Sequence, residues 1–208
     1  MDKVCKICFK DIKDESIFNL VHRNNILCED CFCKLKVKFH KFNISNIKGT
    51  AIYDYDEVIK ELLYKFKGCY DYELKDVFLY RYLSYFKLIY HNYYLIPAPS
   101  YYIDDQKRGF NHVIEIFKPL NLKVLPIIKK LKKHKQSDLS KSDRSSVNSV
   151  LSIDENVDLK GKRILLVDDI LTTGSTLFSC VELIRKLKPK RLEILVIAKT
   201  KTKLKTEY

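Results

Sequence analysis

The stretch ILLVDDILTTGST, residues 164–176, decides the fold that this sequence predicts. Its four consecutive aliphatic residues predict a strand that is buried on both faces, which is typical of a parallel sheet rather than of an alternating antiparallel one. The run ends in two carboxylates, Asp168 and Asp169, here called the acid pair. The acid pair therefore lies at the carboxyl end of the predicted strand, and the sequence predicts an α/β protein with a parallel sheet.

A turn rich in hydroxyl groups, Thr172–Thr176, follows the acid pair and is here called the hydroxyl turn. Leu177, Val181, Ile184 and Leu187 then recur at helical spacing, so the hydroxyl turn lies at a helix N-terminus. Free backbone N–H groups and the positive end of the helix dipole suit this position to a phosphate dianion. Open α/β sheets bind ligands at the carboxyl ends of their strands. We therefore expect phosphate in the turn, and hydroxyls or hydroxyl-bound Mg²⁺ against the acid pair.

Other classes of protein share parts of this pattern. An aliphatic strand that ends in acids is also typical of the Mg²⁺-binding strand of ATPases, but the chain contains no G-x-x-x-x-G-K-[ST]. A dinucleotide-binding G-x-G-x-x-G is absent as well, and the chain has only 5 glycines from which to build one. A purely structural strand, turn and helix is the remaining alternative, although cores rarely bury adjacent Asp residues and several hydroxyls without use.

All thirteen positions of residues 164–176 resemble the phosphoribosyl-pyrophosphate (PRPP) signature of type I phosphoribosyltransferases. In that family the acid pair holds the ribose 2- and 3-hydroxyls, and the turn wraps the 5-phosphate. The resemblance implies that Asp168 and Asp169 bind the ribose. The phosphate-binding residues that it implies are Thr172, Thr173, Gly174, Ser175 and Thr176. Purine-salvage members carry an Asp where this chain has Thr172, which argues against a 6-oxopurine substrate.

Composition sets the broad class. The 208 residues, 46% of them apolar, suit one ordinary domain with a small appendage. The chain has no apolar run near the roughly 20 residues of a membrane helix and no signal-peptide pattern, so we expect a cytoplasmic protein that is not inserted into membranes, with reduced cysteines. The formal charge of +13 favours phosphorylated or polyanionic partners. Coding bias towards lysine, which leaves a solvated basic face, is the alternative.

Two C-x-x-C pairs lie near the amino terminus: Cys5 and Cys8, Cys28 and Cys31. Their spacing is typical of a four-thiolate zinc site, which has no open coordination position and is therefore structural rather than catalytic. We expect this finger to depend on zinc for folding. Free thiols or a disulfide are the alternatives, and Cys33 and His22 are substitute ligands that fit the paired spacing less well. Residues 34–45 are expected to form a short helix and a linker.

The remaining pattern alternates strands and helices. Strands are expected at 49–53, 94–96, 123–126, 150–153 and 192–198, and helices at 58–66, 72–90 and 110–120. Lys107 and Arg108 follow the strand and prolines of 94–99. This places them near the carboxyl end of that strand, a position from which cations can neutralise a pyrophosphate. This order resembles the type I phosphoribosyltransferase succession, in which the first loop meets pyrophosphate and a mobile flap, here 129–148, covers the site. The basic flap suits a multiply charged ligand or a nucleic-acid backbone, and a solvated lysine loop is the alternative.

Together the motifs resemble the ComF family of competence proteins. The quoted motifs are the paired cysteines, 65–68, 96–99, 107–111, 136–148 and the PRPP signature, and they span nearly the whole chain. Ala98 and Lys107 depart from the residues usual in that family. The resemblance implies a type I phosphoribosyltransferase-like domain at 46–208 after a zinc finger and linker at 1–45. It also implies a role in the uptake of single-stranded DNA during natural transformation.

Two functions stay open. In the first, the chain is a phosphoribosyltransferase in which a nucleophile displaces Mg²⁺-bound pyrophosphate from PRPP. Asp168 and Asp169, the residues assigned to catalysis, orient the ribose, while Lys107, Arg108 and flap lysines stabilise the departing pyrophosphate. In the second, the chain holds single-stranded DNA and uses PRPP as a ligand or signal without turnover. The sequence identifies neither a general base nor an acceptor-binding group, and it does not predict the oligomeric state.

Overall fold

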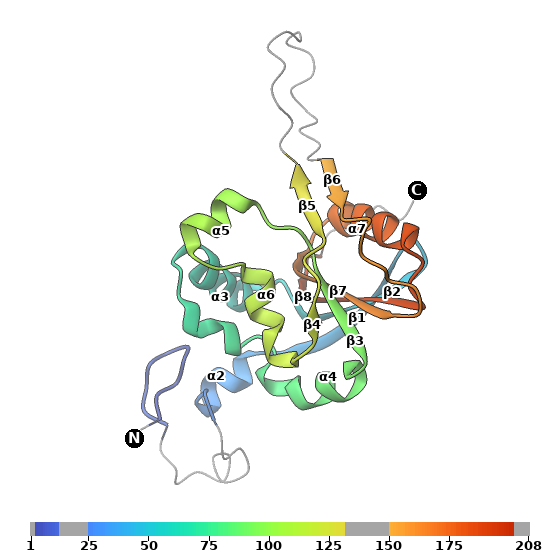
Figure 1. Cartoon of the computed structure of the whole chain (residues 1–208). Coiled ribbons are helices and arrows are strands. Elements are labelled where there is room, and N and C mark those ends of the chain that lie inside the picture. Colours follow the sequence, from blue (N-terminus) through green and yellow to red (C-terminus); the bar gives the residue numbers. More distant parts are fainter. Residues whose placement is uncertain (1–2, 13–24, 132–149, 202–208) are drawn as a thin grey trace.

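The computed structural model describes residues 3–12, 25–131 and 150–201, and all structural statements below refer to these residues. A mixed six-stranded sheet, with the order β1-β2-β8-β7-β3-β4, forms the centre (Figure 1). Every neighbouring pair is parallel except β1 and β2. The strands are β1 (Val37–Ile44), β2 (Ile47–Asp54), β3 (Tyr93–Pro97), β4 (Lys123–Val124), β7 (Arg163–Leu171) and β8 (Arg191–Lys199). The expected α/β class with a parallel sheet is confirmed.

Helices cover both faces of the sheet. They are α2 (Glu29–Lys34), α3 (Glu57–Gly68), α4 (Leu83–Tyr90), α5 (Tyr102–Arg108), α6 (His112–Phe117) and α7 (Ser175–Lys186). Buried side chains of α3, α4 and α6 share one hydrophobic cluster, and those of α7 belong to a second cluster on the other face. A separate antiparallel hairpin, β5 (Ile128–Leu131) and β6 (Val150–Ile153), adds apolar side chains to the second cluster.

Strand β7 lies between β3 and β8 in the middle of the sheet. Ile164 and Leu166 contribute to the cluster under α7, whereas Leu165 and Val167 contribute to the cluster under α3 and α6. All four have no exposed surface. Fully burying such side chains contributes about 1.5–3 kcal/mol each, which explains why an unbroken aliphatic run is needed here. The strand therefore delivers the acid pair to the carboxyl edge of the sheet.

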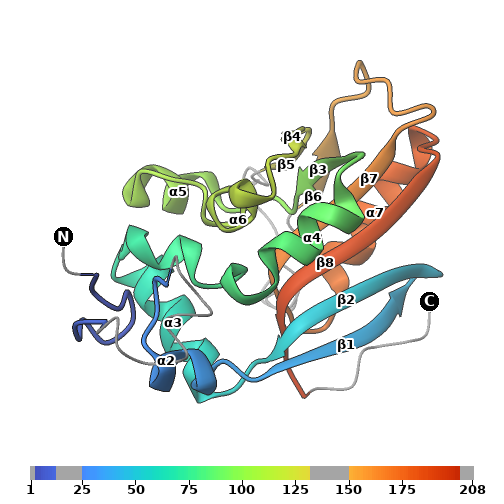
Figure 2. The ribbon, with the colours of Figure 1, turned by 90° about the horizontal axis from the view of Figure 1, so that it is seen from below.

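The prediction of a short helix and a linker at residues 34–45 is wrong. Helix α2 ends at Lys34, and Val37–Ile44 forms β1, which is hydrogen-bonded to β2 at the edge of the sheet (Figure 2). A bulge shifts the register between Val37 and His40, and Phe39 within it has a positive φ of 51°. This bulge breaks the apolar alternation that identifies a strand in the sequence.

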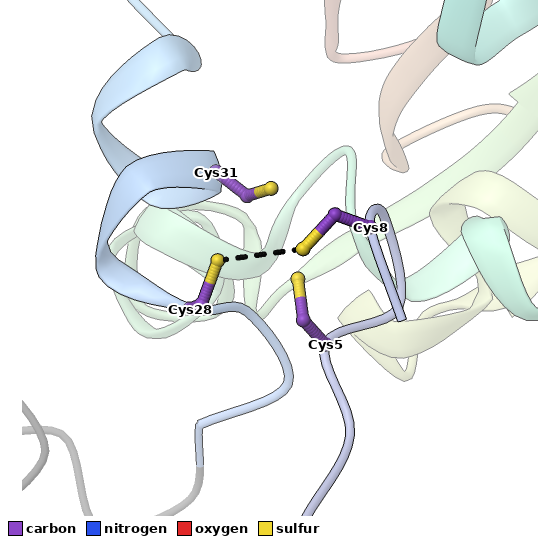
Figure 3. A group of neighbouring side chains, drawn as sticks. All are labelled: Cys5, Cys8, Cys28 and Cys31. Atoms are coloured by element: carbon purple, nitrogen blue, oxygen red, sulfur yellow. Dashed lines mark hydrogen bonds between the residues drawn. The ribbon is translucent and has the colours of Figure 1, made fainter. Parts of the chain in front are cut away.

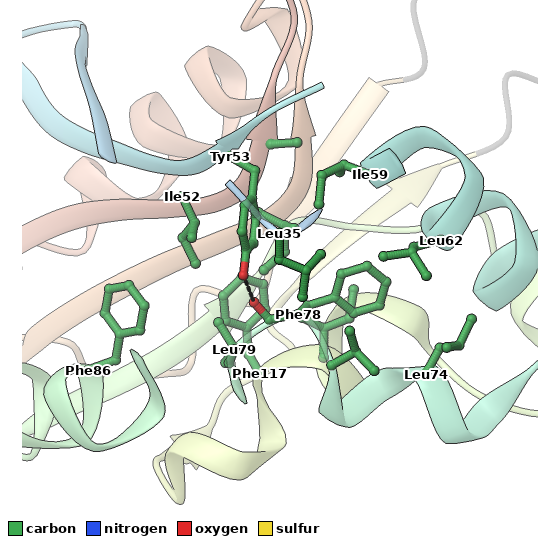
Figure 4. Packing of buried hydrophobic residues seen from close by; sticks show 14 of the residues in the cluster. Leu35, Ile52, Tyr53, Ile59, Leu62, Leu74, Phe78, Leu79, Phe86 and Phe117 are labelled. Atoms are coloured by element: carbon green, nitrogen blue, oxygen red, sulfur yellow. Dashed lines mark hydrogen bonds between the residues drawn. The ribbon is translucent and has the colours of Figure 1, made fainter. Parts of the chain in front are cut away.

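Two more expectations need correction. The helix expected at 72–90 is broken into η1 (Tyr72–Asp76), η2 (Tyr80–Tyr82) and α4, because the chain turns to bury aromatic side chains in a compact core (Figure 4). The interpretation of these aromatics as core holds for Phe78 and Phe86, which are each 1% exposed. The helix expected at 110–120 is α6 followed by η3 (Lys118–Leu120), and the strand expected at 123–126 ends at Val124.

The region after β3 also differs from expectation. Lys107 and Arg108 lie in the last turn of helix α5 and not in a loop, with Gly109 at φ 80° ending the helix. Acidic residues in its first turn and basic residues in its last turn complement the helix dipole, and glycine supplies the left-handed cap. Of the expected flap, 129–131 belongs to β5, and 132–148 lies outside the described residues. In the part of the chain that the structure describes, no helix has both the length and the apolar character needed to span a bilayer.

Candidate functional site

The four predicted metal-binding cysteines come together (Figure 3). All their sulfur atoms lie within 4.8 Å of one another, and Cys8 Sγ is 3.7 Å from Cys28 Sγ. Sulfur atoms at about 2.3 Å from a tetrahedral zinc ion would be roughly 3.8 Å apart, so this arrangement fits the metal. Cys28 caps helix α2 and Cys31 lies in its first turn. Cys33 is exposed and outside the cluster, and His22 lies outside the described residues.

The cysteine cluster is docked on the main body of the protein. Cys5, Cys31 and Phe32 belong to the same hydrophobic cluster as residues of α3, η1 and α6. Lys6 Nζ, between the first two cysteines, contacts Glu73 Oε2 at 2.8 Å and Asp76 Oδ2 at 2.7 Å, both on η1. The described residues around the four cysteines therefore share the core of the main body.

The acid pair lies where β7 leaves the sheet, and the structure separates its two members. Asp169 is buried, and its Oδ2 is 2.5 Å from Lys67 Nζ and 3.1 Å from His112 Nε2. Asp168 is half-buried, and its Oδ1 accepts a hydrogen bond of 2.9 Å from the backbone N–H of Asp169. The two acids therefore have different partners despite their adjacent positions.

These partners give the two carboxyl groups opposite pKa shifts. Burial and the neighbouring charge of Asp169 raise the pKa of Asp168 well above its ordinary value. Burial also acts to raise the pKa of Asp169, but the hydrogen bond from His112 and the charge of Lys67 outweigh burial and hold that pKa well below its usual range. Asp169 is thus ionised at neutral pH, and Asp168 is the member of the pair that retains a proton more readily.

The hydroxyl turn is open to solvent. Thr172, Thr173, Ser175 and Thr176 are all exposed, and Gly174 at φ 82° makes the left-handed bend that starts α7. The turn and Asp168 line a small pocket of about 40 Å³. The structure therefore brings Asp168 together with all five predicted phosphate-binding residues.

The two predicted pyrophosphate-binding cations differ in placement. Lys107 is exposed, and the described contacts of the acid pair do not include it. Arg108 is half-buried: its Nη1 lies 2.9 Å from Asp105 Oδ1 and 2.9 Å from His112 Nδ1, and its Nε donates to the Lys67 carbonyl at 3.2 Å. Arg108 thus contacts the acid pair through His112 and is already engaged by protein groups.

Lys67 and His112 are the site residues that sequence reasoning missed. Lys67 lies in the last turn of α3, and its segment 65–68 carried the ComF resemblance, although no role was assigned to it. His112 starts α6 directly after Asn111, whose side chain caps that helix by accepting from Ile114 N at 2.9 Å. No local pattern pairs either residue with Asp169, because the contact depends on how α3 and α6 pack on the sheet.

A larger pocket of about 580 Å³ borders the same lysine. Its described lining consists of Tyr55, Glu57, Lys60, Glu61, Leu63, Tyr64, Lys67 and Gly68. Tyr55 donates its backbone N–H to Lys199 O at the end of β8, so the pocket opens at the carboxyl edge of the sheet. Its volume falls in the range of small-molecule sites.

Comparisons with known proteins found similarity to a phosphoribosyl transferase family and to competence proteins. The model of the phosphoribosyl transferase domain family matches residues 107–208. Competence protein ComFC of Streptococcus pneumoniae R6 is 29% identical over 178 residues, which cover 83% of this chain and 76% of that protein. ComFC of Bacillus subtilis 168 is 30% identical over 132 residues, which cover 62% of this chain and 55% of that protein. A purine phosphoribosyltransferase from Pyrococcus horikoshii, at 19% identity and a TM-score of 0.39, aligns over 63% of this chain and 78% of its own.

The parallel sheet, the domain match and the signature on β7 define a type I phosphoribosyltransferase-like protein. The similarity to the two competence proteins extends over most of the chain and supports a ComF-family protein of this type.

Proposed function

We propose that this protein binds PRPP at the carboxyl end of β7 and acts in DNA uptake during natural transformation. The observation that carries the proposal is the pocket in which Asp168 meets the exposed hydroxyl turn at the start of α7. The ribose diol lies against Asp168 and Asp169, and the 5-phosphate accepts hydrogen bonds from the turn. The proposal also includes Mg²⁺ bound to the pyrophosphate and a cytoplasmic location for the protein.

The proposed reaction is a phosphoribosyl transfer. A nucleophile donates an electron pair to the anomeric carbon of PRPP while the bond from that carbon to the pyrophosphate oxygen breaks. The pyrophosphate leaves with the bonding electrons, and a bound Mg²⁺ would neutralise part of its charge. The chain's own residues hold and orient the sugar, so their contribution is positioning and electrostatic stabilisation. The exposed side chain of Lys107 is available to the departing pyrophosphate.

The proposal includes a structural zinc ion held by the thiolates of Cys5, Cys8, Cys28 and Cys31. Their mutual distances support this ion, and the closed set of four ligands leaves it no catalytic position. The division of the chain at residues 45 and 46 stays a prediction. Because β1 is hydrogen-bonded to β2, we place the end of the finger itself before Val37.

A calorimetric titration with PRPP and Mg²⁺ tests the site. We expect the double variant Asp168→Asn, Asp169→Asn to lose at least about tenfold in affinity, which corresponds to about 1.4 kcal/mol. The matched control is Asp154→Asn, Glu155→Gln, which removes two adjacent exposed acids elsewhere. Equal affinity of the site variant and the control would refute the assignment.

A second candidate function is binding without turnover, with single-stranded DNA as the main partner. The net charge of +13 favours it. Pyrophosphate release in the presence of a panel of bases and amines separates the two candidates. Release with one acceptor establishes the transferase, and a panel without release, in a protein that binds PRPP, favours the binding role.

A further inference from the structure

We propose that Lys67, with His112, is a positioning residue that holds Asp169 ionised and correctly oriented for the ribose. This inference rests on the proposed PRPP site and adds to it a residue from α3, upstream of residues 107–208, which match the phosphoribosyl transferase domain. The site would then be completed by a segment outside the residues that match the family model.

The geometry at Asp169 is asymmetric. Both described partners of its carboxylate, Lys67 and His112, bind the same oxygen, Oδ2. No described buried side-chain oxygen or nitrogen lacks a hydrogen-bond partner, and Oδ1 is contacted by neither Lys67 nor His112. One oxygen is therefore fixed by the protein and the other is left to accept a hydrogen bond from a ribose hydroxyl.

The hydrogen-bond chain behind His112 defines which proton it carries. An arginine side chain has donors only, so Arg108 Nη1 must donate to His112 Nδ1 at 2.9 Å. The proton of a neutral imidazole then resides on Nε2, which donates to Asp169 Oδ2. The same Nη1 also donates to Asp105 Oδ1 at 2.9 Å, which helps to hold Arg108 in place. Lys67 brings the positive charge of an amine into direct contact with Asp169 Oδ2, at 2.5 Å.

Lys67 is also held by its backbone. Its carbonyl oxygen accepts from Arg108 Nε at 3.2 Å, so α3 and α5 are fixed to one another next to the acid pair. The side chain of Lys67 is 27% exposed, whereas that of Asp169 is 10% exposed. An ion pair with one partly exposed cation costs less desolvation than a fully buried pair, and loss of the cation leaves a buried charge without compensation.

The test is PRPP·Mg²⁺ titration of Lys67→Met, with Lys65→Met as matched control. Lys65 lies on the same helix and pairs with Glu61 at 2.7 Å, away from the acid pair. We expect Lys67→Met to bind PRPP at least about tenfold more weakly, Lys65→Met to bind as wild type, and Lys67→Arg to recover most of the affinity.

The pH profile separates positioning from a merely structural role. The groups that face Asp169 are Lys67 on α3, His112 on α6 and Asp168 on β7. Without Lys67 the pKa of Asp169 rises, so we expect the affinity of Lys67→Met, relative to wild type, to fall further as the pH is lowered from 8 to 5.5. A constant ratio across this range overturns the inference, as does unchanged or tighter binding.

A second pair of variants covers the case in which Lys67→Met does not fold. His112→Gln can place an amide donor near the position of Nε2, whereas His112→Leu cannot. We expect the Gln variant to bind PRPP more tightly than the Leu variant, and equal binding by two folded variants contradicts the inference. Failure of the wild-type protein to bind PRPP would instead refute the proposed function, so the two failures are distinguishable.

Discussion

Binding of PRPP should release one proton from the acid pair, and that proton should come from Asp168. Burial and the charge of Asp169 raise the pKa of Asp168 in the ligand-free protein. Ribose hydroxyls donate hydrogen bonds to an ionised carboxylate, so a bound sugar lowers that pKa again. Asp169 is already ionised because of His112 and Lys67, and it contributes no proton. The structure therefore sets the expected number at one rather than two.

The magnitude follows from linkage. Below the pKa of Asp168 in the free protein, release of one proton makes the affinity rise about tenfold for each unit of increasing pH, and the dependence flattens above that pKa. Calorimetry in two buffers with different ionisation enthalpies counts the protons directly. PRPP itself releases protons when it binds Mg²⁺, so the quantity to compare is the difference between wild type and Asp168→Asn.

We expect that difference to approach one proton per bound PRPP at a pH below the free-state pKa of Asp168. Asp169→Asn is an informative second variant, because removal of the neighbouring charge lowers the pKa of Asp168 and moves the pH dependence to lower pH. A wild-type protein that releases the same number of protons as Asp168→Asn across the pH range would refute this account of the acid pair.

Four further predictions follow from the structure. Because the folded-state pKa of Asp168 is raised, its ionisation costs stability as the pH rises above the unfolded value; Asp168→Asn should raise the melting temperature of the ligand-free protein more at pH 8 than at pH 5, and equal changes would contradict this. Removal of the metal by a chelator should expose Leu27 and Phe32, which contribute about 1.5–3 kcal/mol each, and should lower the melting temperature by roughly 10 °C; no metal in the purified protein would refute the zinc site. A Cβ on Gly49 would lie 2.2 Å from the Phe42 ring, so Gly49→Ala should destabilise by about 1–3 kcal/mol in denaturant unfolding, and adding Phe42→Leu should recover part of the loss. If single-stranded DNA binds, the logarithm of its affinity should fall against the logarithm of salt concentration with a slope of about 0.7 per neutralised phosphate, whereas a slope near zero would exclude phosphate contacts.

The sequence predicts those parts of the fold and the site that depend on local pattern. The aliphatic run 164–167 predicts a strand with two covered faces, and the apolar spacing after the glycine and hydroxyls predicts a helix start. The four cysteines are predictable for the same reason, since their spacing alone lets the sulfurs converge. The strand and turn depend on contacts within a short segment, and the metal site depends on one type of side chain, the cysteine thiolate.

The structural features that the sequence did not predict depend on packing between distant segments. Strand β1 was missed because the bulge around Phe39 interrupts its alternation, and the broken helix at 72–90 was missed because apolar spacing does not reveal where a chain turns. The contact of Lys67 with Asp169 joins residues on α3 and β7 that are far apart in the sequence. A lysine in an exposed-looking helix turn gives no local sign that it will neutralise a buried acid.

The unequal acid pair follows from the geometry of the strand that carries it. Successive side chains of a strand point to opposite faces, so adjacent acids must enter different surroundings. Asp169 points toward the face covered by α3 and α6, where Lys67 and His112 meet it, and Asp168 lines the pocket at the start of α7. Two neighbouring carboxylates with equal charge would repel each other, and the asymmetry reduces this cost while the site is empty. A sugar diol that bridges both acids must therefore bind one carboxylate that is already prepared and a second that becomes charged on binding.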